Sequence, residues 1–431
     1  MTLFEELHER GLIFQVTHPE ELPEAMQKPL TVYAGFDPTA DSLHIGHLLP
    51  IVTLRRFYEA GHRVIALIGG GTALIGDPSG KSEERQLLAA QEILANAEKI
   101  KAQLSRLLGA ENDPERILIL NNYDWLSKQG LIDFLRQIGK YFKVNEMIKK
   151  DSVKKRLEDE KHGISFLEFS YQLFQAFDYY YLKKTYDCIL QIGGSDQWGN
   201  ITGGMDLITK KALEKDSELK DAVAFGLTMP LILDSEGKKM GKTSEGKVVW
   251  LDGNKMLPYD YYQYWIRVHD ADVIRFLKYF TFKPLDEIEA LSEAVAQRPE
   301  KREAQSVLAG AITEFVHGTE ALQRIQRISR ALFYGEVSQL NEGDFEELAR
   351  QIPSVKINLP DRMRILDFLK ESGFIASKQM ARNLIKSRAI RLNGKVIEDI
   401  DYQVSKADAL FGRFIMLRRG KKEHFLVIVQ G

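Results

Sequence analysis

Two histidines that follow a strand-like run form the first group of side chains that could do chemistry. The run is Thr31–Phe36, and His44 and His47 stand at the predicted start of a helix over 43–60. A helix N-terminus offers unpaired N–H groups and a partial positive charge, and residues three apart share a face. We therefore predict that both histidines face a bound polyanion and that Gly46, between them, lets a flat ring approach the backbone.

A glycine-rich segment over residues 69–82 follows the next strand-like run and carries a second group. It resembles a nucleotide-binding P-loop, but Ile75 stands where that motif requires glycine. The glycines allow the backbone to pass close to a ligand. Asp77 could hold a cation, while Lys81 and Arg85 could reach phosphates. We predict a ligand-binding turn, and a P-loop phosphotransferase remains an alternative function.

Polar residues also follow a third strand-like run and mark one face of a predicted helix. Gly193 starts a pair of glycines that permits close approach to a ribose, and Asp196 could accept both ribose hydroxyl protons. Tyr171, Gln175 and Asp178 lie at positions i, i+4 and i+7 of the helix, so they share a face. Because such faces are usually apolar, we predict that these three residues line a polar pocket.

A lysine-rich segment over residues 238–246 has the composition of a mobile loop. Lys239 and Lys242 lie on either side of Gly241, which gives flexibility. Such a loop suits closure over a polyphosphate whose negative charge grows during a reaction. The segment therefore predicts a second phosphate-binding element, opposite the histidines.

Short apolar strands that alternate with amphipathic helices, from residue 30 to about 225, must position these groups. The pattern predicts a mostly parallel sheet with crossover helices, in which ligands bind beyond the carboxyl ends of the strands. Residues 257–332 have a helical pattern without strand signals. The predicted strands are Thr31–Phe36, Arg63–Ile68, Ile117–Leu120 and Asp187–Ile192.

The composition is that of a soluble globular protein of 431 residues with a formal net charge of −2. No apolar run reaches the roughly 18 residues that a membrane span needs, and the N-terminus lacks signal-peptide features. We therefore expect no membrane partner and a cytoplasmic location, in agreement with a single cysteine, Cys188, in an apolar run. Residues 351–431 hold 16 Lys and Arg against 8 Asp and Glu, which predicts an acidic partner such as nucleic acid.

Three of these segments occur in an order that is typical of one family. They are His44-Ile45-Gly46-His47, Gly193-Gly194-Ser195-Asp196-Gln197-Trp198-Gly199-Asn200 and Lys239-Met240-Gly241-Lys242-Thr243. Together they resemble bacterial tyrosyl-tRNA synthetases, which are class I aminoacyl-tRNA synthetases. The resemblance covers nearly the full length and implies that ATP activates L-tyrosine to tyrosyl-adenylate and pyrophosphate, before transfer of tyrosine to the 3′ end of tRNA(Tyr). A tryptophan-specific relative is the alternative within the class.

The resemblance also implies which residues bind tyrosine. They are Tyr33 and Asp178 at the phenol, Asp77, Tyr171 and Gln175 at the ammonium group, and Gln197 near the reacting carboxylate. Pairing of a phenol with Tyr33 and Asp178 argues against tryptophan, because an indole lacks a phenol. A polar pocket left unpaired by phenylalanine carries a desolvation cost, and tyrosine enzymes of this family are themselves the standard example of such discrimination without editing.

The residues implied at ATP form a second set. Those at the adenylate are Gly35, Asp37, Gly46, Gly193, Asp196 and Lys242, with His47 on the ribose side. Those at the reacting phosphates are Thr39, His44, Lys81, Arg85, Lys239, Lys242 and Thr243. None of them need act as a nucleophile or general base, because the tyrosine carboxylate attacks the α-phosphate in line. Mg²⁺ would arrive with ATP, and we predict no protein metal site and no tightly bound cofactor.

Two positions depart from the family pattern. Gly241 and Thr243 stand where the lysine-rich loop generally carries serines, which could alter the kinetics of the loop. Pro50 stands where some relatives place a hydrogen-bonding threonine. A ribose contact is therefore not expected at Pro50, and the proline could kink the predicted helix.

The resemblance implies an α/β fold with a Rossmann-like parallel-sheet catalytic domain, then an α-helical domain and a small C-terminal α+β S4-like RNA-binding domain. The predicted divisions are 1–225 for the catalytic domain with a dimer-interface insertion around 125–141, 226–256 for the lysine-rich loop and connector, 257–334 for the anticodon-region helices, 335–356 for a linker and 357–431 for the S4-like domain.

The predicted RNA-binding residues, on a basic helix before an Asn-Gly hairpin, are Ser377, Lys378, Arg382, Lys386 and Arg388. The partners implied are tRNA(Tyr), L-tyrosine, ATP and a second copy of the chain. A non-enzymatic RNA-binding protein with a synthetase fold is the third alternative, which the intact histidines and lysines disfavour.

Overall fold

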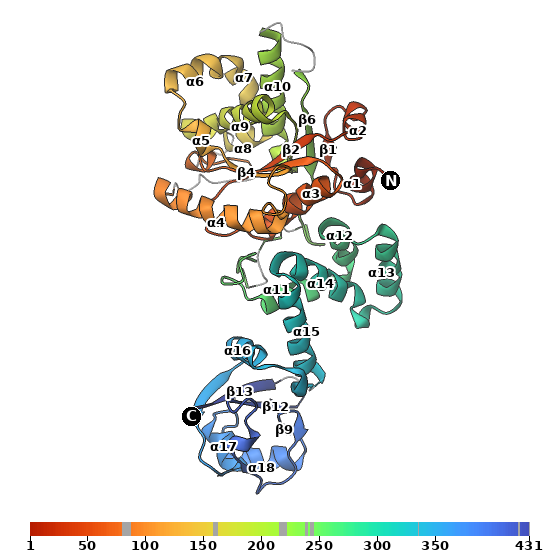
Figure 1. Ribbon diagram of the computed structural model, residues 1–431, viewed down its shortest axis with the longest axis vertical. Helices are drawn as coiled ribbons and strands as arrows, with labels where there is room; N and C mark the ends of the chain where they lie inside the picture. Colours follow the sequence, from red (N-terminus) through yellow and green to blue (C-terminus); the bar gives the residue numbers. More distant parts are fainter. Residues whose placement is uncertain are drawn as a thin grey trace. The chain divides into compact units, whose positions relative to one another are not determined.

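The computed structural model describes residues 1–79, 88–157, 163–214, 222–237, 240–241, 245–334, 336–420 and 423–430. These residues form two compact units, Met1–Val316 and His317–Gly431 (Figure 1). No helix of the described part is long and apolar enough to cross a membrane.

A six-stranded sheet in the order β1-β6-β5-β2-β3-β4 forms the centre of the first unit, and only β1 pairs antiparallel. This confirms the predicted parallel sheet. The strands are β1 (Gln15–Val16), β2 (Thr31–Phe36), β3 (Arg63–Ile68), β4 (Ile117–Asn121), β5 (Cys188–Gly194) and β6 (Phe225–Met229). Strand β5 begins one residue later than predicted, because Asp187 ends the preceding helix in the left-handed conformation with φ of 49°.

Helices cover both faces of this sheet, and the side chains of each strand alternate between two hydrophobic cores. Val32 and Ala34 pack in the core shared with α3 and α4, whereas Tyr33 packs in the core shared with α9 and α10. Figure 1 shows α3 and α4 on one side of the sheet and α9 and α10 on the other. These helices are α3 (Leu48–Glu59), α4 (Ala90–Leu108), α9 (Phe166–Tyr186) and α10 (Trp198–Glu214).

The order of the strands reverses between β2 and β5, which lie side by side. From β2 the chain proceeds outward to β3 and β4, and from β5 it proceeds in the opposite direction to β6. Parallel sheets bind ligands beyond the carboxyl ends of their strands at such a switch point. The residues that follow β2 and β5 are therefore the first place to look for a site.

Other α-helices also begin in the first unit. They are α1 (Leu3–Glu9), α2 (Glu21–Ala25), α5 (Tyr123–Leu126), α6 (Leu131–Gln137), α7 (Val144–Met147), α8 (Asp151–Leu157), α11 (Pro258–Ile266), α12 (Asp270–Phe280), α13 (Leu285–Gln297) and α14 (Glu303–His317). The predicted helical block is thus observed, with Trp265 of α11 buried in edge contacts with Phe276 and Phe280. Arg56 of α3 donates to the carbonyl oxygen of Thr281, so buried polar contacts join the block to the sheet helices.

The second unit contains a five-stranded sheet in the order β10-β9-β12-β13-β7 and a two-stranded sheet of β11 and β8. Its strands are β7 (Ser354–Asn358), β8 (Met363–Arg364), β9 (Ile390–Leu392), β10 (Lys395–Val396), β11 (Gln403–Val404), β12 (Phe414–Arg419) and β13 (Glu423–Gln430), and its helices are α15 (Thr319–Tyr334), α16 (Glu342–Gln351), α17 (Ile365–Glu371) and α18 (Lys378–Lys386). Asn393 and Gly394 form the predicted hairpin turn, both with positive φ.

The segment 335–356 is not the linker that the sequence suggested, because its described part packs on the C-terminal sheet. Phe345 of α16 stacks on Phe414 of β12 with ring centroids 5.2 Å apart, and Arg413 pairs with Glu342 at 2.8 Å. Strand β7 pairs with β13 from Ser354 onward. The other predicted domain limits stay predictions.

Candidate active site

The two histidines follow β2 at the switch point, but they precede the helix rather than lie in its first turn. Residues 45–47 form a 3-10 turn, and α3 begins at Leu48. His44 is extended and caps this turn: its Nδ1 accepts the backbone N–H of Gly46 at 3.0 Å. His47 Nδ1 accepts the backbone N–H of His44 at 3.2 Å, and the two ring centroids lie 4.1 Å apart.

These two contacts determine what the imidazoles can offer to a ligand. A neutral imidazole that accepts at Nδ1 carries its proton on Nε2. His44 and His47 therefore each carry the ring proton on Nε2, and an N–H of this kind suits a phosphate oxygen without any proton transfer. A Cβ on Gly46 would lie 2.7 Å from Cε1 of His44, so the space that this glycine leaves is filled by the ring of His44 itself.

Pro50 does not break α3. The helix starts at Leu48, which places Pro50 in the first turn. Backbone N–H groups of the first turn have no partner within a helix, so a proline there removes no helical hydrogen bond. The predicted kink at Pro50 is therefore not required.

Buried polar residues from β2, from α9 and from the residues that follow β4 form the first group of the candidate site. Asp178 of α9 accepts hydrogen bonds at both carboxylate oxygens, from Trp125 Nε1 at 2.7 Å and from Asn122 Nδ2 at 2.8 Å. Burial raises the pKa of Asp178 to about 7, although the two hydrogen bonds favour the charged form. Tyr33 of β2 is also buried, and its Oη has no hydrogen-bond partner among the described residues.

The unpaired Tyr33 hydroxyl is a strong sign of a ligand. A buried hydroxyl without a partner costs roughly 1–3 kcal/mol, so such groups are rare unless something else satisfies them. Burial, and then the nearby Asp178, raise the pKa of Tyr33 well above its usual value, so the phenol stays protonated. The pair therefore offers one hydroxyl and one carboxylate to a buried polar group of a ligand.

A second network joins the residues after β2 to α9. Asp37 accepts from the Tyr171 hydroxyl at 3.0 Å and from Thr72 Oγ1 at 2.9 Å. Asn122 Nδ2 donates to Thr72 Oγ1 at 3.0 Å, which connects this network to Asp178. A Cβ on Gly69 would lie 1.9 Å from Oδ1 of Asp37. Gly69, the first glycine of the glycine-rich segment, must therefore lack a side chain, because a Cβ would overlap the carboxylate of Asp37.

A third network connects the glycine-rich segment with the turn after β5. Gln197 Nε2 donates to Asp77 Oδ2 at 2.7 Å, and Asn200 Nδ2 donates to Gln197 Oε1 at 3.2 Å. Asp77 also accepts from the backbone N–H of Ser79 at 2.9 Å. The Gln175 Oε1 on α9 is buried without a partner among the described residues. The Gln197 amide and the Asp77 carboxylate are thus held in place beside each other. The Gln175 oxygen is a second buried polar atom of the site, after the Tyr33 hydroxyl, without a partner among the described residues.

The remaining predicted ATP residues of the described chain line the same ends of β2 and β5. Gly35 is exposed within β2, and a Cβ there would meet nothing within 4 Å. Gly193 and Asp196 lie at the end of β5 and in the turn that follows it, and Thr39 is exposed in the loop after β2. These four residues therefore share the switch point with the histidines.

Five predicted phosphate-binding residues lie outside the described residues. They are Lys81, Arg85, Lys239, Lys242 and Thr243. The described ends of the lysine-rich segment lead to the histidines: Val249 N–H donates to Gly241 O at 3.0 Å, and Ile45 N–H donates to Val249 O at 3.0 Å. The backbone that leaves this segment is therefore joined to the histidine turn.

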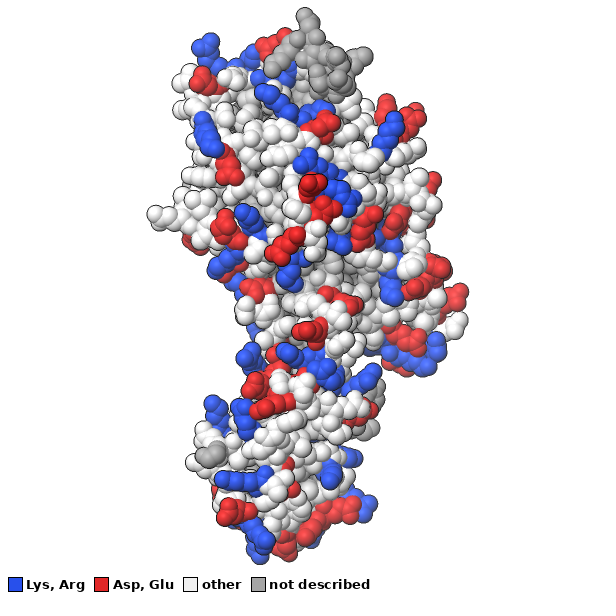
Figure 2. Space-filling model, viewed as in Figure 1, with Lys and Arg blue, Asp and Glu red and all other residues white. Residues whose placement is uncertain are grey.

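The predicted RNA-binding residues lie in the second unit. Ser377 caps α18 by accepting the backbone N–H of Met380 at 3.2 Å. Lys378, Arg382 and Lys386 are exposed at intervals of four residues, so they share one face of α18, and Arg388 is exposed after its end. Figure 2 shows Lys and Arg interspersed with Asp and Glu on the visible face, so the charge surplus of the tail is not one continuous patch there.

Sequence reasoning missed three residues of the site: Thr72, Asn122 and Trp125. Asn122 and Trp125 follow the carboxyl end of β4, and the rule that sends ligands to strand ends could have marked them. Trp125 was instead placed at the edge of a dimer interface, but it is buried and stacks on Tyr181 at 4.4 Å. Its hydrogen-bond partner, Asp178, lies 53 residues later in the sequence, so no local pattern could reveal the pair.

Comparison with known proteins agrees with this site. The family described as "tRNA synthetases class I (W and Y)" matches residues 25–334, and the family described as "Tyrosine--tRNA ligase SYY-like C-terminal domain" matches residues 344–427. The chain is 48% identical over 426 residues to tyrosine–tRNA ligase 1 of Bacillus subtilis, with 99% of both chains covered. It is 48% identical to tyrosine–tRNA ligase of Staphylococcus haemolyticus, with 99% of this chain and 98% of that one covered.

A solved structure shows the same relation. The crystal structure of a C-terminally truncated mitochondrial tyrosyl-tRNA synthetase from Coccidioides posadasii has a TM-score of 0.66 and 36% identity, and covers 76% of this chain and 91% of that one. The parallel sheet with histidines at its switch point is thus that of the class I aminoacyl-tRNA synthetases. Within that class, the chain belongs to the tyrosine–tRNA ligase family, and the tryptophan-specific alternative is not favoured.

Proposed function

We propose that this protein activates L-tyrosine with ATP and then transfers tyrosine to tRNA(Tyr), and that activation takes place at the switch point between β2 and β5. The observation that supports tyrosine as the substrate is the buried pair of Tyr33 and Asp178. The Tyr33 hydroxyl has no partner among the described residues, and Asp178 supplies a carboxylate. A phenol can pair with both groups, because it donates to the carboxylate and accepts from the hydroxyl. An indole N–H can only donate, and a phenyl ring can do neither.

The other end of tyrosine extends from this pair toward the strand ends. Asp77, Tyr171 and Gln175 would hold its ammonium group, and Gln197, which is hydrogen-bonded to Asp77, would lie beside its carboxylate. ATP enters as its magnesium complex. Its adenylate part would lie over Gly35 and Gly193, beside Asp37, Gly46 and Asp196.

Catalysis in this proposal rests on positioning and charge stabilisation. The tyrosine carboxylate attacks the α-phosphate in line, and negative charge grows on the departing pyrophosphate. Thr39 and the Nε2–H of His44 would stabilise that charge, and His47 would contact the ribose side of ATP. Lys81, Arg85, Lys239, Lys242 and Thr243 are proposed to do the same from segments outside the described residues.

Amino-acid-dependent exchange of pyrophosphate into ATP tests this function. The purified protein should catalyse exchange with tyrosine and not with the other amino acids. Exchange with tryptophan instead of tyrosine would overturn the substrate assignment. ATP turnover that needs no amino acid would favour the phosphotransferase alternative.

Tyrosine affinity is expected to increase as the pH rises through about 7. The phenol donates to the ionised carboxylate of Asp178, whose pKa burial raises to about 7, so a fall in pH protonates the acceptor and weakens binding. The measurement is the KM for tyrosine in pyrophosphate exchange between about pH 6 and pH 8. Trp125→Phe removes a hydrogen bond that favours the charged form and should move the midpoint upward; a flat profile in both proteins would contradict the role of Asp178.

Replacing Lys378, Arg382 and Lys386 together with alanine is expected to slow tRNA charging about tenfold at moderate salt and to leave pyrophosphate exchange unchanged. Each lost phosphate contact removes counterion release, so the salt dependence of charging should become shallower. Ser377 stays in place to keep the cap of α18. A control with exposed Lys28 and Lys101 replaced should charge normally, and an equal loss in that control would refute a specific role for α18.

A homodimer is the proposed assembly, and exposed apolar side chains support it. On α6 and α7 and beside them, large apolar residues are exposed in the single chain: Leu131, Ile132, Leu135, Val144 and Ile148. Such a cluster usually marks an interface. Sedimentation should therefore give about twice the chain mass of 49.2 kDa. We also infer a cytoplasmic location, where tRNA and ATP are available.

A further inference from the structure

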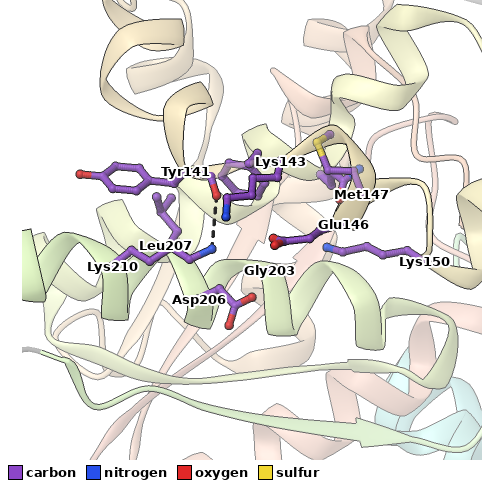
Figure 3. Close-up of a pocket in the computed structure, with 11 residues that line it drawn as sticks. Tyr141, Lys143, Glu146, Met147, Lys150, Gly203, Asp206, Leu207 and Lys210 are labelled. Carbon is purple, nitrogen blue, oxygen red and sulfur yellow. Dashed lines mark hydrogen bonds between the residues drawn. The ribbon is translucent and has the colours of Figure 1, made fainter.

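Lys150 occupies an unusual slot next to the proposed activation site. It lies between α7 and α8, and its Nζ donates to the carbonyl oxygen of Gly199 at 2.6 Å. Figure 3 shows its side chain lying along α10 near Gly203. Burial lowers the pKa of Lys150 to about 8, so the amine is mostly charged at neutral pH.

Two glycines of α10 leave the room that this lysine fills. A Cβ on Gly203 would lie 2.9 Å from Lys150 Nζ, and a Cβ on Gly199 would lie 3.4 Å from its Cδ. The two glycines are four residues apart, so they share a helix face. Each glycine in a helix costs roughly 0.5–1 kcal/mol relative to alanine. Helix α10 thus carries two unfavourable residues on the side where Lys150 lies.

The start of α10 also carries residues of the proposed site. Gly199 lies between Gln197, whose Nε2 donates to Asp77 at 2.7 Å, and Asn200, which donates to Gln197 Oε1 at 3.2 Å. Lys150 therefore holds the backbone of the turn that carries the Gln197–Asp77 pair. The hydrogen bond of Lys150 to Gly199 goes to the backbone of α10 and not to a side chain of this pair, so it acts on the pair through α10.

We propose that Lys150 is a positioning residue for tyrosine activation: its bond to the Gly199 carbonyl holds the start of α10, and with it Gln197, in the geometry that receives tyrosine. The inference rests on the proposed placement of tyrosine beside Gln197 and Asp77.

Other charged groups lie around Lys150, and some of them also affect the pKa of its amine. Asp206 and Lys210 lie on α10, and Glu146 and Lys143 line the same pocket from α7 and the residue before it. Asp206 favours the charged amine and Lys210 opposes it. Lys143 is exposed at this pocket, so it serves as a matched control of equal charge.

Lys150→Met keeps most of the side-chain length and removes the ammonium group. It is expected to raise the KM for tyrosine and lower kcat in pyrophosphate exchange, with a combined loss of about tenfold in kcat/KM, while the KM for ATP stays the same. Lys143→Met should match the unchanged protein. The exchange assay contains no tRNA, so a loss confined to tRNA charging would overturn the proposal and assign Lys150 to a nucleic-acid contact.

A double-mutant cycle separates positioning from general stability. In a Gln197→Ala protein, Lys150→Met should have almost no further effect on exchange, because both changes act on one group. Full additivity would overturn the proposal. If Gln197→Ala alone leaves exchange unchanged, the placement of tyrosine is wrong; if it impairs exchange but Lys150→Met does not, only the positioning role is wrong.

Gly203→Ala tests the slot from the other side, and it remains informative if Lys150→Met does not fold. Its Cβ would lie 2.9 Å from the Lys150 amine, which must shift and lengthen its bond to Gly199, so exchange should fall, although by less than in Lys150→Met. Gly310→Ala in α14 is the matched control, because a Cβ there meets nothing within 4 Å. Gly310→Ala should keep full activity, and normal exchange in Gly203→Ala would overturn the proposal.

Discussion

Replacing His44 with alanine is expected to slow tyrosyl-adenylate formation roughly 100-fold or more and to leave tyrosine affinity nearly unchanged. The Nε2–H of His44 has no role for the bound amino acid in our proposal, because its partner is charge that develops on the departing pyrophosphate. Its Nδ1 is already occupied by the N–H of Gly46. Single-turnover formation of the adenylate and equilibrium binding of tyrosine measure the two effects separately.

A second substitution at the same position separates chemistry from structure. His44→Ala also removes the cap of the turn, which costs about 1 kcal/mol of stability. His44→Asn offers a new cap acceptor but no Nε2–H donor, so it should recover stability and remain as slow as His44→Ala. His8→Ala, at an exposed histidine of α1, should have no effect. If His44→Ala weakened tyrosine binding as much as it slowed the reaction, the proposed role would be wrong.

Replacing Asp178 with alanine is expected to raise the KM for tyrosine roughly 100-fold and to reduce discrimination against phenylalanine by a similar factor. A hydrogen bond to a charged group contributes about 1.5–3 kcal/mol, and the phenol would lose its acceptor. Phenylalanine loses no hydrogen bond in the variant, and the buried carboxylate that its ring could not pair with is gone. The measurement is the ratio of kcat/KM for tyrosine and phenylalanine in pyrophosphate exchange.

A companion variant guards against a purely structural effect of Asp178→Ala. That change leaves Asn122 and Trp125 without their acceptor, which destabilises the fold. Tyr33→Phe removes a hydroxyl that has no partner among the described residues, so it should keep or raise the melting temperature and still weaken tyrosine binding. Unchanged discrimination in Tyr33→Phe would show that the phenol is bound elsewhere.

Periodic elements of the fold were predictable from sequence because their signals are local. Strands β2 and β3 have the predicted ends, and α9 includes the predicted helix with its face of Tyr171, Gln175 and Asp178. The start of α3 was predicted less well, since the imidazoles of His44 and His47 act as caps of a 3-10 turn. Histidine is not a usual capping residue, so propensity could not reveal this turn.

The prediction of a linker over residues 335–356 was wrong for a different reason. Polar and turn residues around α16 suggest a solvated connection, but Phe345 finds Phe414 nearly 70 residues later in the chain and stacks on it. Strand β7 likewise becomes part of a sheet only because β13 lies beside it. Strand formation of this kind depends on a partner that no local pattern identifies.

The sequence by itself determined the parallel α/β architecture, the family and most of the residues proposed to contact substrates, because motifs and periodicity are properties of neighbouring positions. Only the tertiary structure decided how those residues act: which imidazole nitrogen remains a donor, that Asn122 and Trp125 hold Asp178, and that Lys150 fills a slot of two glycines. Each of these depends on which groups are buried together. Burial sets both the cost of an unpaired polar atom and the pKa of a carboxyl group, and the folded chain alone fixes burial.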